Sequence, residues 1–138
     1  PGALQGKIVE IPVIYGGPEA EDFTEWHEGA GLSAEDAIAL HSGATYTVAA
    51  VGAMPGFGYL SGLDPRLARP RRKVPRAVVP EGAVIIGGAQ AGVMPTTAPS
   101  GWHIIGHTDV TLFDALANPP CLFAPGDTVR FIVAGVRS

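Results

Sequence analysis

The sequence predicts a mainly β domain, either a barrel or a sandwich, with minor helices. Its 138 residues fit one domain, and a hydrophobic fraction of 46% is enough to form a core. The 19 glycines and 13 prolines show no period and indicate many turns. Short apolar runs rich in β-branched residues lie between these turns, as expected for buried strands. Short strands joined by tight turns are typical of all-β domains.

The first elements of the chain are predicted to be a strand and a short helix. Residues 7–13 alternate well enough for a strand. Pro12 places this strand at an edge or at a strand end, because proline donates no ladder hydrogen bond. Residues 22–28 predict a short helix with Asp22 near its N-cap.

A second helix is predicted to begin after Ser33. This serine can cap the helix, and Asp36 stands three residues further on, as in a short-armed capping box. His41 falls on the apolar stripe and in the last turn of this helix. That position favours a half-buried, hydrogen-bonded histidine over a ligand-binding one. Residues 45–51 then predict a strand.

A glycine-rich aromatic loop at residues 53–60, which includes Tyr59, is followed by a basic loop. Six of the nine Lys and Arg residues lie between Arg66 and Arg76, and prolines keep this segment extended. A basic run can indicate nucleic acid or phosphate binding. This run has no interleaved aromatic residues and the chain has a net charge of −4. These features favour a solvated or partner-facing patch, and we expect no nucleic-acid binding.

Residues 82–107 are predicted to organise the domain as three strands with a glycine bend and a loop. The strands are expected at residues 83–86, at a segment ending with residues 92–95, and at residues 102–106, with a loop at 96–101. Adjacent glycines after the first strand indicate a bend or a close approach of backbone or ligand. This small-residue composition suits a pocket wall. A tight barrel corner would need the same glycines.

The stretch is predicted to supply a ligand-facing wall. The side-chain amide of Gln90 can donate and accept a hydrogen bond at once, which suits an amide substrate. Alternation along a strand separates Trp102 from His103 and His107, so we expect Trp102 to pack and His107 to be the polar contact. The candidate wall is Gln90, Thr97, Trp102, His103 or His107, with His41 and Tyr59 nearby and close backbone approach at Gly87, Gly88 and Gly92.

The C-terminal part is predicted to contain a short helix and a last strand. Residues 109–116 predict a turn and a short helix with an apolar face, and the last strand is expected at residues 128–133. Cys121 is the single cysteine, so no internal disulfide can form. It is expected to be a small buried hydrophobic residue. These features are consistent with a reducing cytoplasm.

Several classes of chemistry are not predicted by the sequence. It contains neither a Gly-x-Ser-x-Gly nucleophile motif nor a phosphate-binding loop, so we expect no ATP binding by this chain alone. His103 and His107 would lie about 13 Å apart on a straight strand, too far to share a metal ion. No apolar run reaches the length of a membrane-spanning helix, and we expect no membrane association.

An ordered series of motifs covers nearly the whole chain and resembles the allophanate hydrolase subunit 1 family, which includes 5-oxoprolinase components of the PxpB type and the kinase inhibitor KipI. The motifs are I-P-V-I-Y-G-G (11–17), G-L-S-A-E-D-A-I-A-L-H (31–41), P-G-F-G-Y-L-S-G-L-D-P-R-L (55–67), P-R-R-K-V-P-R-A-V-V-P-E-G (70–82), G-G-A-Q-A-G-V-M-P (87–95), P-S-G-W-H-I-I-G-H-T (99–108), L-F-D (112–114) and P-G-D-T-V-R-F (125–131).

This resemblance implies a cyclophilin-like closed β-barrel over residues 1–138, a single domain that lacks the family's N-terminal domain. It implies a subunit of an ATP-dependent amide hydrolase, 5-oxoprolinase. This subunit would act with a homologous cyclophilin-like subunit of the PxpC or KipA type and with a PxpA-type subunit. ATP would be used by the assembled complex. The alternatives are a KipI-type regulator of a histidine kinase and an allophanate hydrolase or urea carboxylase component. The chain departs from the family at Ala91, where the family often has threonine, and at His107, where it often has arginine, and both changes would alter the polarity of the pocket.

Overall fold

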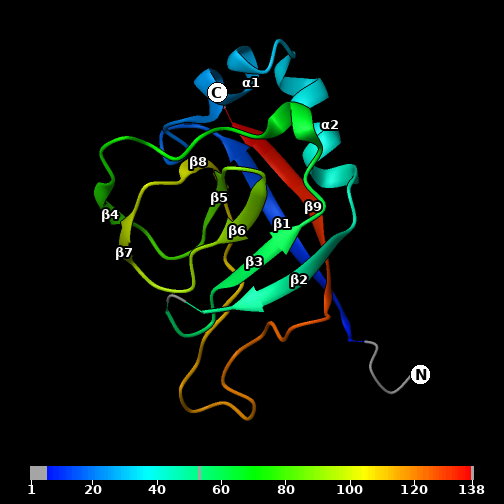
Figure 1. Cartoon of the computed structure of the whole chain (residues 1–138), viewed down its shortest axis with the longest axis vertical. Coiled ribbons are helices and arrows are strands. Elements are labelled where there is room, and N and C mark those ends of the chain that lie inside the picture. The colour runs from blue at the N-terminus through cyan, green and yellow to red at the C-terminus, as the bar shows by residue number, and fades with distance from the viewer. Residues whose placement is uncertain (1–5, 53, 138) are drawn as a thin grey trace.

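The computed structural model of the chain describes residues 6–52 and 54–137. In this part of the chain seven strands close into a barrel, and two short helices lie at one end of it (Figure 1). In chain order the elements are β1 (Ile8–Gly16), α1 (Phe23–Gly29), α2 (Ala34–Gly43), β2 (Tyr46–Val51), β3 (Gly58–Ser61), the 3₁₀ turn η2 (Pro65–Leu67), β4 (Arg76–Val79), β5 (Ala83–Gly87), β6 (Gln90–Val93), β7 (Ala98–Ser100), β8 (His103–His107) and β9 (Thr128–Arg137). The barrel order is β1-β8-β5-β6-β3-β2-β9. The predicted mainly β, closed barrel with short helices is confirmed.

The barrel closes by parallel pairing of β1 with β9. Their register runs from Ile8 opposite Thr128 to Gly16 opposite Arg137, with one shift after Val13. The strand β1 is longer than the predicted 7–13, because pairing with β9 continues to its last residue. On its other side β1 pairs with β8 only at Ile14 and Tyr15, so Pro12 lies beyond the end of that ladder. Pro12 is thus unpaired on the β8 side only, and the prediction that it stands at a sheet edge or a strand end is wrong, because it lies in the middle of β1 opposite Ile132 of β9.

The core fills the barrel and continues under the helices. All five residues of β5 are buried, as the apolar run at 83–86 predicts. Both predicted helices are present, and the side chain of Ser33 accepts a hydrogen bond from the Asp36 N–H at 3.1 Å. The buried Trp26 of α1 donates its indole N–H to the Leu67 carbonyl at 3.0 Å. This bond ties α1 to the turn η2, and the Tyr46 hydroxyl of β2 ties α2 to the barrel by donating to the His41 carbonyl at 2.8 Å.

Beside the barrel lies a small second sheet made of β4 and β7 (Figure 1). We call β4, β7 and the preceding segment 69–75 the flap. The prediction of one continuous loop at 96–101 is wrong, because β7 pairs with β4 at Arg76–Ser100 and Val79–Ala98. The predicted loop at 53–60 likewise ends in a strand, since β3 pairs with β2. Residue 53 of that loop lies outside the described residues.

The predicted helix at 109–116 is wrong. The chain instead forms an irregular loop between β8 and β9. This loop extends from the lower end of the barrel in Figure 1. Leu112 is buried, and Phe113 pairs with Cys121 across the loop. The apolar residues that indicated a helix therefore pack into the core or bridge the loop, whereas Leu116 is 96% exposed. The described residues contain no helix long and apolar enough to cross a membrane.

Candidate functional site

The residues predicted to form one ligand-facing wall lie in separate parts of the structure. Tyr59 and Trp102 line a groove between the flap and the barrel, which we call the Trp102 groove. His107 lines a different pocket beside β1 and β9. His41 lies in the core and is fully buried. The predicted wall residues therefore belong to two separate pockets and to the core.

An aromatic cluster forms the barrel side of the Trp102 groove. Phe57 meets Tyr59 edge to face at a ring-centroid distance of 4.9 Å, and it meets Trp102 in the same way at 5.4 Å. A Cβ atom on Gly87 would overlap the Trp102 indole, and one on Gly92 would lie 3.1 Å from the Phe57 ring. These two glycines therefore make room for the aromatic cluster.

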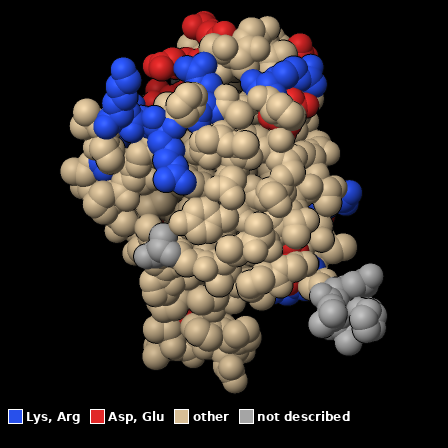
Figure 2. Space-filling model, in the orientation of Figure 1, with Lys and Arg blue, Asp and Glu red and all other residues tan. Residues whose placement is uncertain are grey.

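Two arginines of the flap form the opposite side of the groove. The guanidinium carbon of Arg71 lies 5.5 Å from the centroid of the Trp102 ring, within the range of a cation–π contact. Arg72 also lines the groove, as does Ser100 at the end of β7. Lys and Arg side chains gather over this side of the molecule, at the upper left of Figure 2. The cavity measures about 320 Å³ and combines an apolar aromatic wall with a positively charged edge.

The flap is anchored to the barrel through the buried carboxylate of Asp22. Arg76 donates two hydrogen bonds to it, at 2.6 and 2.9 Å, and the Ile104 N–H donates a third at 2.7 Å. Burial opposes ionisation of Asp22, but these hydrogen bonds outweigh it and hold the pKa of this carboxyl below its ordinary value. Asp22 precedes α1 as predicted, yet its side chain makes no capping hydrogen bond.

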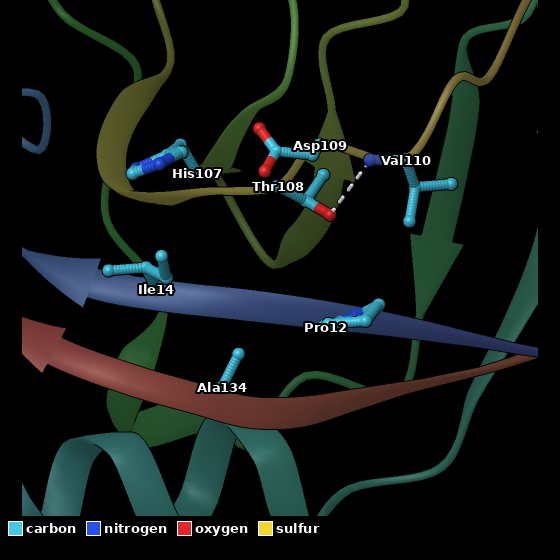
Figure 3. Close-up of a pocket in the computed structure, with 7 residues that line it drawn as sticks. All are labelled: Pro12, Ile14, His107, Thr108, Asp109, Val110 and Ala134. Carbon is cyan, nitrogen blue, oxygen red and sulfur yellow. Dashed lines mark hydrogen bonds between the residues drawn. The ribbon is translucent and has the colours of Figure 1, made fainter.

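The second pocket lies between the barrel strands β1 and β9 and the chain that follows β8 (Figure 3). Pro12, Ile14 and Ala134 give it an apolar floor, and the segment from His107 to Val110 closes the other side. The Val110 N–H donates to the Thr108 hydroxyl at 3.2 Å, the dashed line in Figure 3. The buried Nδ1 of His107 has no hydrogen-bond partner among the described residues, and it lies 3.9 Å from the Glu19 carboxylate.

His41 is a core residue. Its Nδ1 lies 2.5 Å from the Tyr15 hydroxyl, and its ring stacks on Phe131 at a centroid distance of 4.4 Å. Complete burial lowers the pKa of His41 from its ordinary value to about 3, so the ring is neutral at pH 7. The predicted hydrogen-bonded histidine is observed, with complete rather than partial burial.

The remaining predicted wall residues make structural contacts and do not line the Trp102 groove. Gln90 begins β6 opposite Gly87. The Glu81 N–H donates to the Thr97 hydroxyl at 3.0 Å. The Nε2–H of His103 donates to the Pro70 carbonyl at 2.7 Å. Gly88 adopts a positive φ of 58° with no atom near its absent Cβ, so its role is to turn the chain. The described residues contain no group of three or more side chains that could hold a metal ion.

Sequence reasoning missed Arg71 and Arg72 as site residues. The basic loop contains no aromatic residue, and this absence favoured a solvated patch. The aromatic side chains that face Arg71 come from β3 and from the residue that precedes β8, which lie far away in the sequence. No local pattern brings these segments together, and only the barrel topology does so.

The chain belongs to the family of carboxyltransferase domains, subdomain C and D, whose model matches residues 2–123. It is 47% identical over 134 residues to the B-subunit of 5-oxoprolinase from Haemophilus influenzae, covering 97% of this chain and 63% of that protein. The predicted resemblance to a family that includes this 5-oxoprolinase component is confirmed. The chain spans less than two thirds of the length of this relative.

Solved structures with the same fold include a conserved uncharacterized protein from Pyrococcus horikoshii. Its TM-score is 0.89 at 41% sequence identity, over 96% of this chain and 62% of that chain. The urea carboxylase of Kluyveromyces lactis matches with a TM-score of 0.74 at 20% identity, over 96% of this chain and 14% of that chain. The likeness to the urea carboxylase is one of fold alone.

Proposed function

We propose that this chain is the substrate-binding part of a 5-oxoprolinase, an enzyme assembly that uses ATP to open the cyclic amide 5-oxoproline to glutamate. The name and the 47% identity of the Haemophilus influenzae relative support this proposal. The assembly includes a homologous cyclophilin-like subunit. ATP is used by the assembled complex rather than by this chain alone.

The Trp102 groove is the observation that carries the proposal. 5-Oxoproline is a small ring that carries a lactam and a carboxylate. The aromatic surface of Tyr59 suits the ring, and the charged edge at Arg71, which lies over the Trp102 ring, suits the carboxylate. The Ser100 hydroxyl accepts a hydrogen bond from the backbone N–H of Trp102 at 3.1 Å. Its own hydrogen stays free to donate to the lactam. A cavity of about 320 Å³ is adequate for such a ligand.

The groove itself is suited to binding rather than to bond cleavage. Its lining includes the Ser100 hydroxyl but no histidine, cysteine or carboxylate side chain that would serve as a base or a second nucleophile. We therefore assign the positioning of 5-oxoproline to this chain. The groups that use ATP are assigned to the rest of the assembly.

Reconstitution of the complex tests this proposal. The chain is combined with the other 5-oxoprolinase subunits, and ATP-dependent formation of glutamate from 5-oxoproline is measured. Tyr59→Leu is expected to reduce turnover strongly, because it removes one aromatic face of the groove. Gln90→Ala and His107→Ala, outside the groove, serve as controls. Loss of turnover in either control with normal activity of Tyr59→Leu would refute the Trp102 groove as the binding site and point to Gln90 or to the pocket at His107. Inhibition of a histidine kinase without turnover would support the regulatory alternative instead.

A further inference from the structure

We infer that Arg71 is the carboxylate-recognition residue of the Trp102 groove, which makes this groove selective for small cyclic compounds that carry a carboxylate. The inference rests on the proposed function and deepens it, because it states which group of the substrate this chain recognises.

The charge of Arg71 is free to bind a ligand. Arg76 is paired with Asp22, and Arg72 lies 3.7 Å from the same carboxylate. Arg71, in contrast, makes no ion pair and no side-chain hydrogen bond within residues 6–52 and 54–137. Lys73 is equally free of such partners there, but it does not line the groove. Of the cations that line the groove, Arg71 is therefore the one available for an anion.

The Trp102 ring holds the Arg71 guanidinium at the groove without consuming its N–H donors. A cation over an aromatic face is attracted by the ring electrons, and the distance of 5.5 Å fits this contact. The planar guanidinium keeps a fork of donors, which matches the two oxygens of a carboxylate. A ligand ring that lies against the aromatic wall would place an attached carboxylate within reach of this fork.

The backbone on both sides of Arg71 is fixed, so the arginine is pre-organised. The carbonyl of Pro70 accepts a hydrogen bond from His103 Nε2 at 2.7 Å, and the Arg72 N–H donates to the Gly101 carbonyl at 2.6 Å. These anchors tie the residues before and after Arg71 to β8 and to the segment before it. A residue held in place before binding loses less conformational freedom when the ligand arrives. His103, predicted as a wall residue, thereby acts as a positioning residue for Arg71.

Binding of a lactam with and without a carboxylate tests the inference on the full chain. 5-Oxoproline and the neutral lactam 2-pyrrolidinone are titrated while the indole N–H signals of the two tryptophans are followed by NMR. Trp102 reports on the groove, whereas Trp26 donates its indole N–H inside the core and serves as an internal reference. We expect 5-oxoproline to shift the Trp102 signal with an affinity at least about tenfold above that of 2-pyrrolidinone, since a hydrogen bond to a charged group stabilises by more than about 1.4 kcal/mol.

Three variants separate a specific contact from general attraction. Arg71→Gln is expected to weaken 5-oxoproline binding by about tenfold or more and to leave 2-pyrrolidinone unchanged. Arg71→Lys keeps the charge and is expected to retain part of the affinity. Lys73→Gln removes a neighbouring charge outside the groove and is expected to bind like the parent chain. Equal binding of the two lactams, an unchanged Arg71→Gln, or an equal loss in Lys73→Gln would overturn the inference.

A second carboxylate distinguishes failure of the inference from failure of the proposed function. L-Proline carries the same ring size and a carboxylate, but it has a protonated ring amine in place of the neutral lactam. If proline shifts the Trp102 signal in an Arg71-dependent manner while 5-oxoproline does not, carboxylate recognition stands and 5-oxoproline is excluded as the substrate. If neither compound shifts the signal, the inference is overturned, whatever the reconstituted complex does.

Discussion

Acidification from pH 7 to pH 5 is expected to destabilise the folded chain through His41. Burial lowers the pKa of His41 to about 3 in the folded state, whereas an unfolded histidine has a pKa of about 6.5. Below about pH 6.5 the unfolded chain therefore binds a proton that the folded chain does not bind until about pH 3. The free energy of unfolding then falls by up to about 1.4 kcal/mol per pH unit, so the loss at pH 5 is about 2 kcal/mol. This is a large share of the roughly 5–15 kcal/mol that stabilise a typical domain.

Urea unfolding at pH 7, 6 and 5, followed by tryptophan fluorescence, measures this loss. The matched control is the double variant Tyr15→Phe with His41→Leu, which removes both members of the 2.5 Å hydrogen-bonded pair and leaves neither unsatisfied. Its stability is expected to fall by about 2 kcal/mol less over the same range. The pKa values of Asp22 and Asp127 are lowered in the folded state. Their contribution to the free energy of unfolding is therefore lost only below the unfolded pKa of about 3.8, which lies outside this pH range. An identical pH dependence in the parent chain and the double variant would refute the reasoning.

Three further predictions concern the flap, the aromatic cluster and the activity. Asp22→Asn removes the buried carboxylate partner of Arg76 and leaves only the exposed Glu21 carboxylate, so urea unfolding is expected to show a loss of about 2–3 kcal/mol; an unchanged midpoint would contradict the anchoring role. Gly87→Ala is expected to cost about 1–3 kcal/mol because its Cβ overlaps Trp102. Gly43→Ala, at the open end of α2, serves as its control and is expected to be neutral or stabilising. The chain alone is expected to show no ATP-dependent hydrolysis of 5-oxoproline, and turnover without other subunits would refute this.

The elements that are predictable from the sequence are those with a strong local signal. The uninterrupted apolar run at 83–86 indicates a strand buried on both faces, and β5 is such a strand. Ser33 and Asp36 mark the start of a helix through capping chemistry, and the cap is observed. The helix cap lies within three residues of its signal, and β5 forms a hairpin with the strand β6 that follows it.

The flap and the groove depend on contacts that no local signal encodes. The strand β7 is three residues long and exists because it pairs with β4, which precedes it by about twenty residues. Residues 109–116 have a helical spacing of apolar side chains, yet the burial of Leu112 and the bridge from Phe113 to Cys121 override it. The groove joins Tyr59, Arg71 and Trp102, whose sequence separation hides their proximity.

The parallel ladder between β1 and β9 has a consequence for the synthesis of the protein. About 120 residues separate the paired segments of the two strands. At a translation rate of roughly 5–20 residues per second, β9 is synthesised roughly 6–24 seconds after β1. During that interval β1 lacks its partner β9, so one of its edges is unpaired and its apolar side chains are not fully buried. Nascent chains in this condition aggregate or recruit chaperones. The barrel is therefore completed only after translation of β9, as a late and long-range step that is expected to be slow.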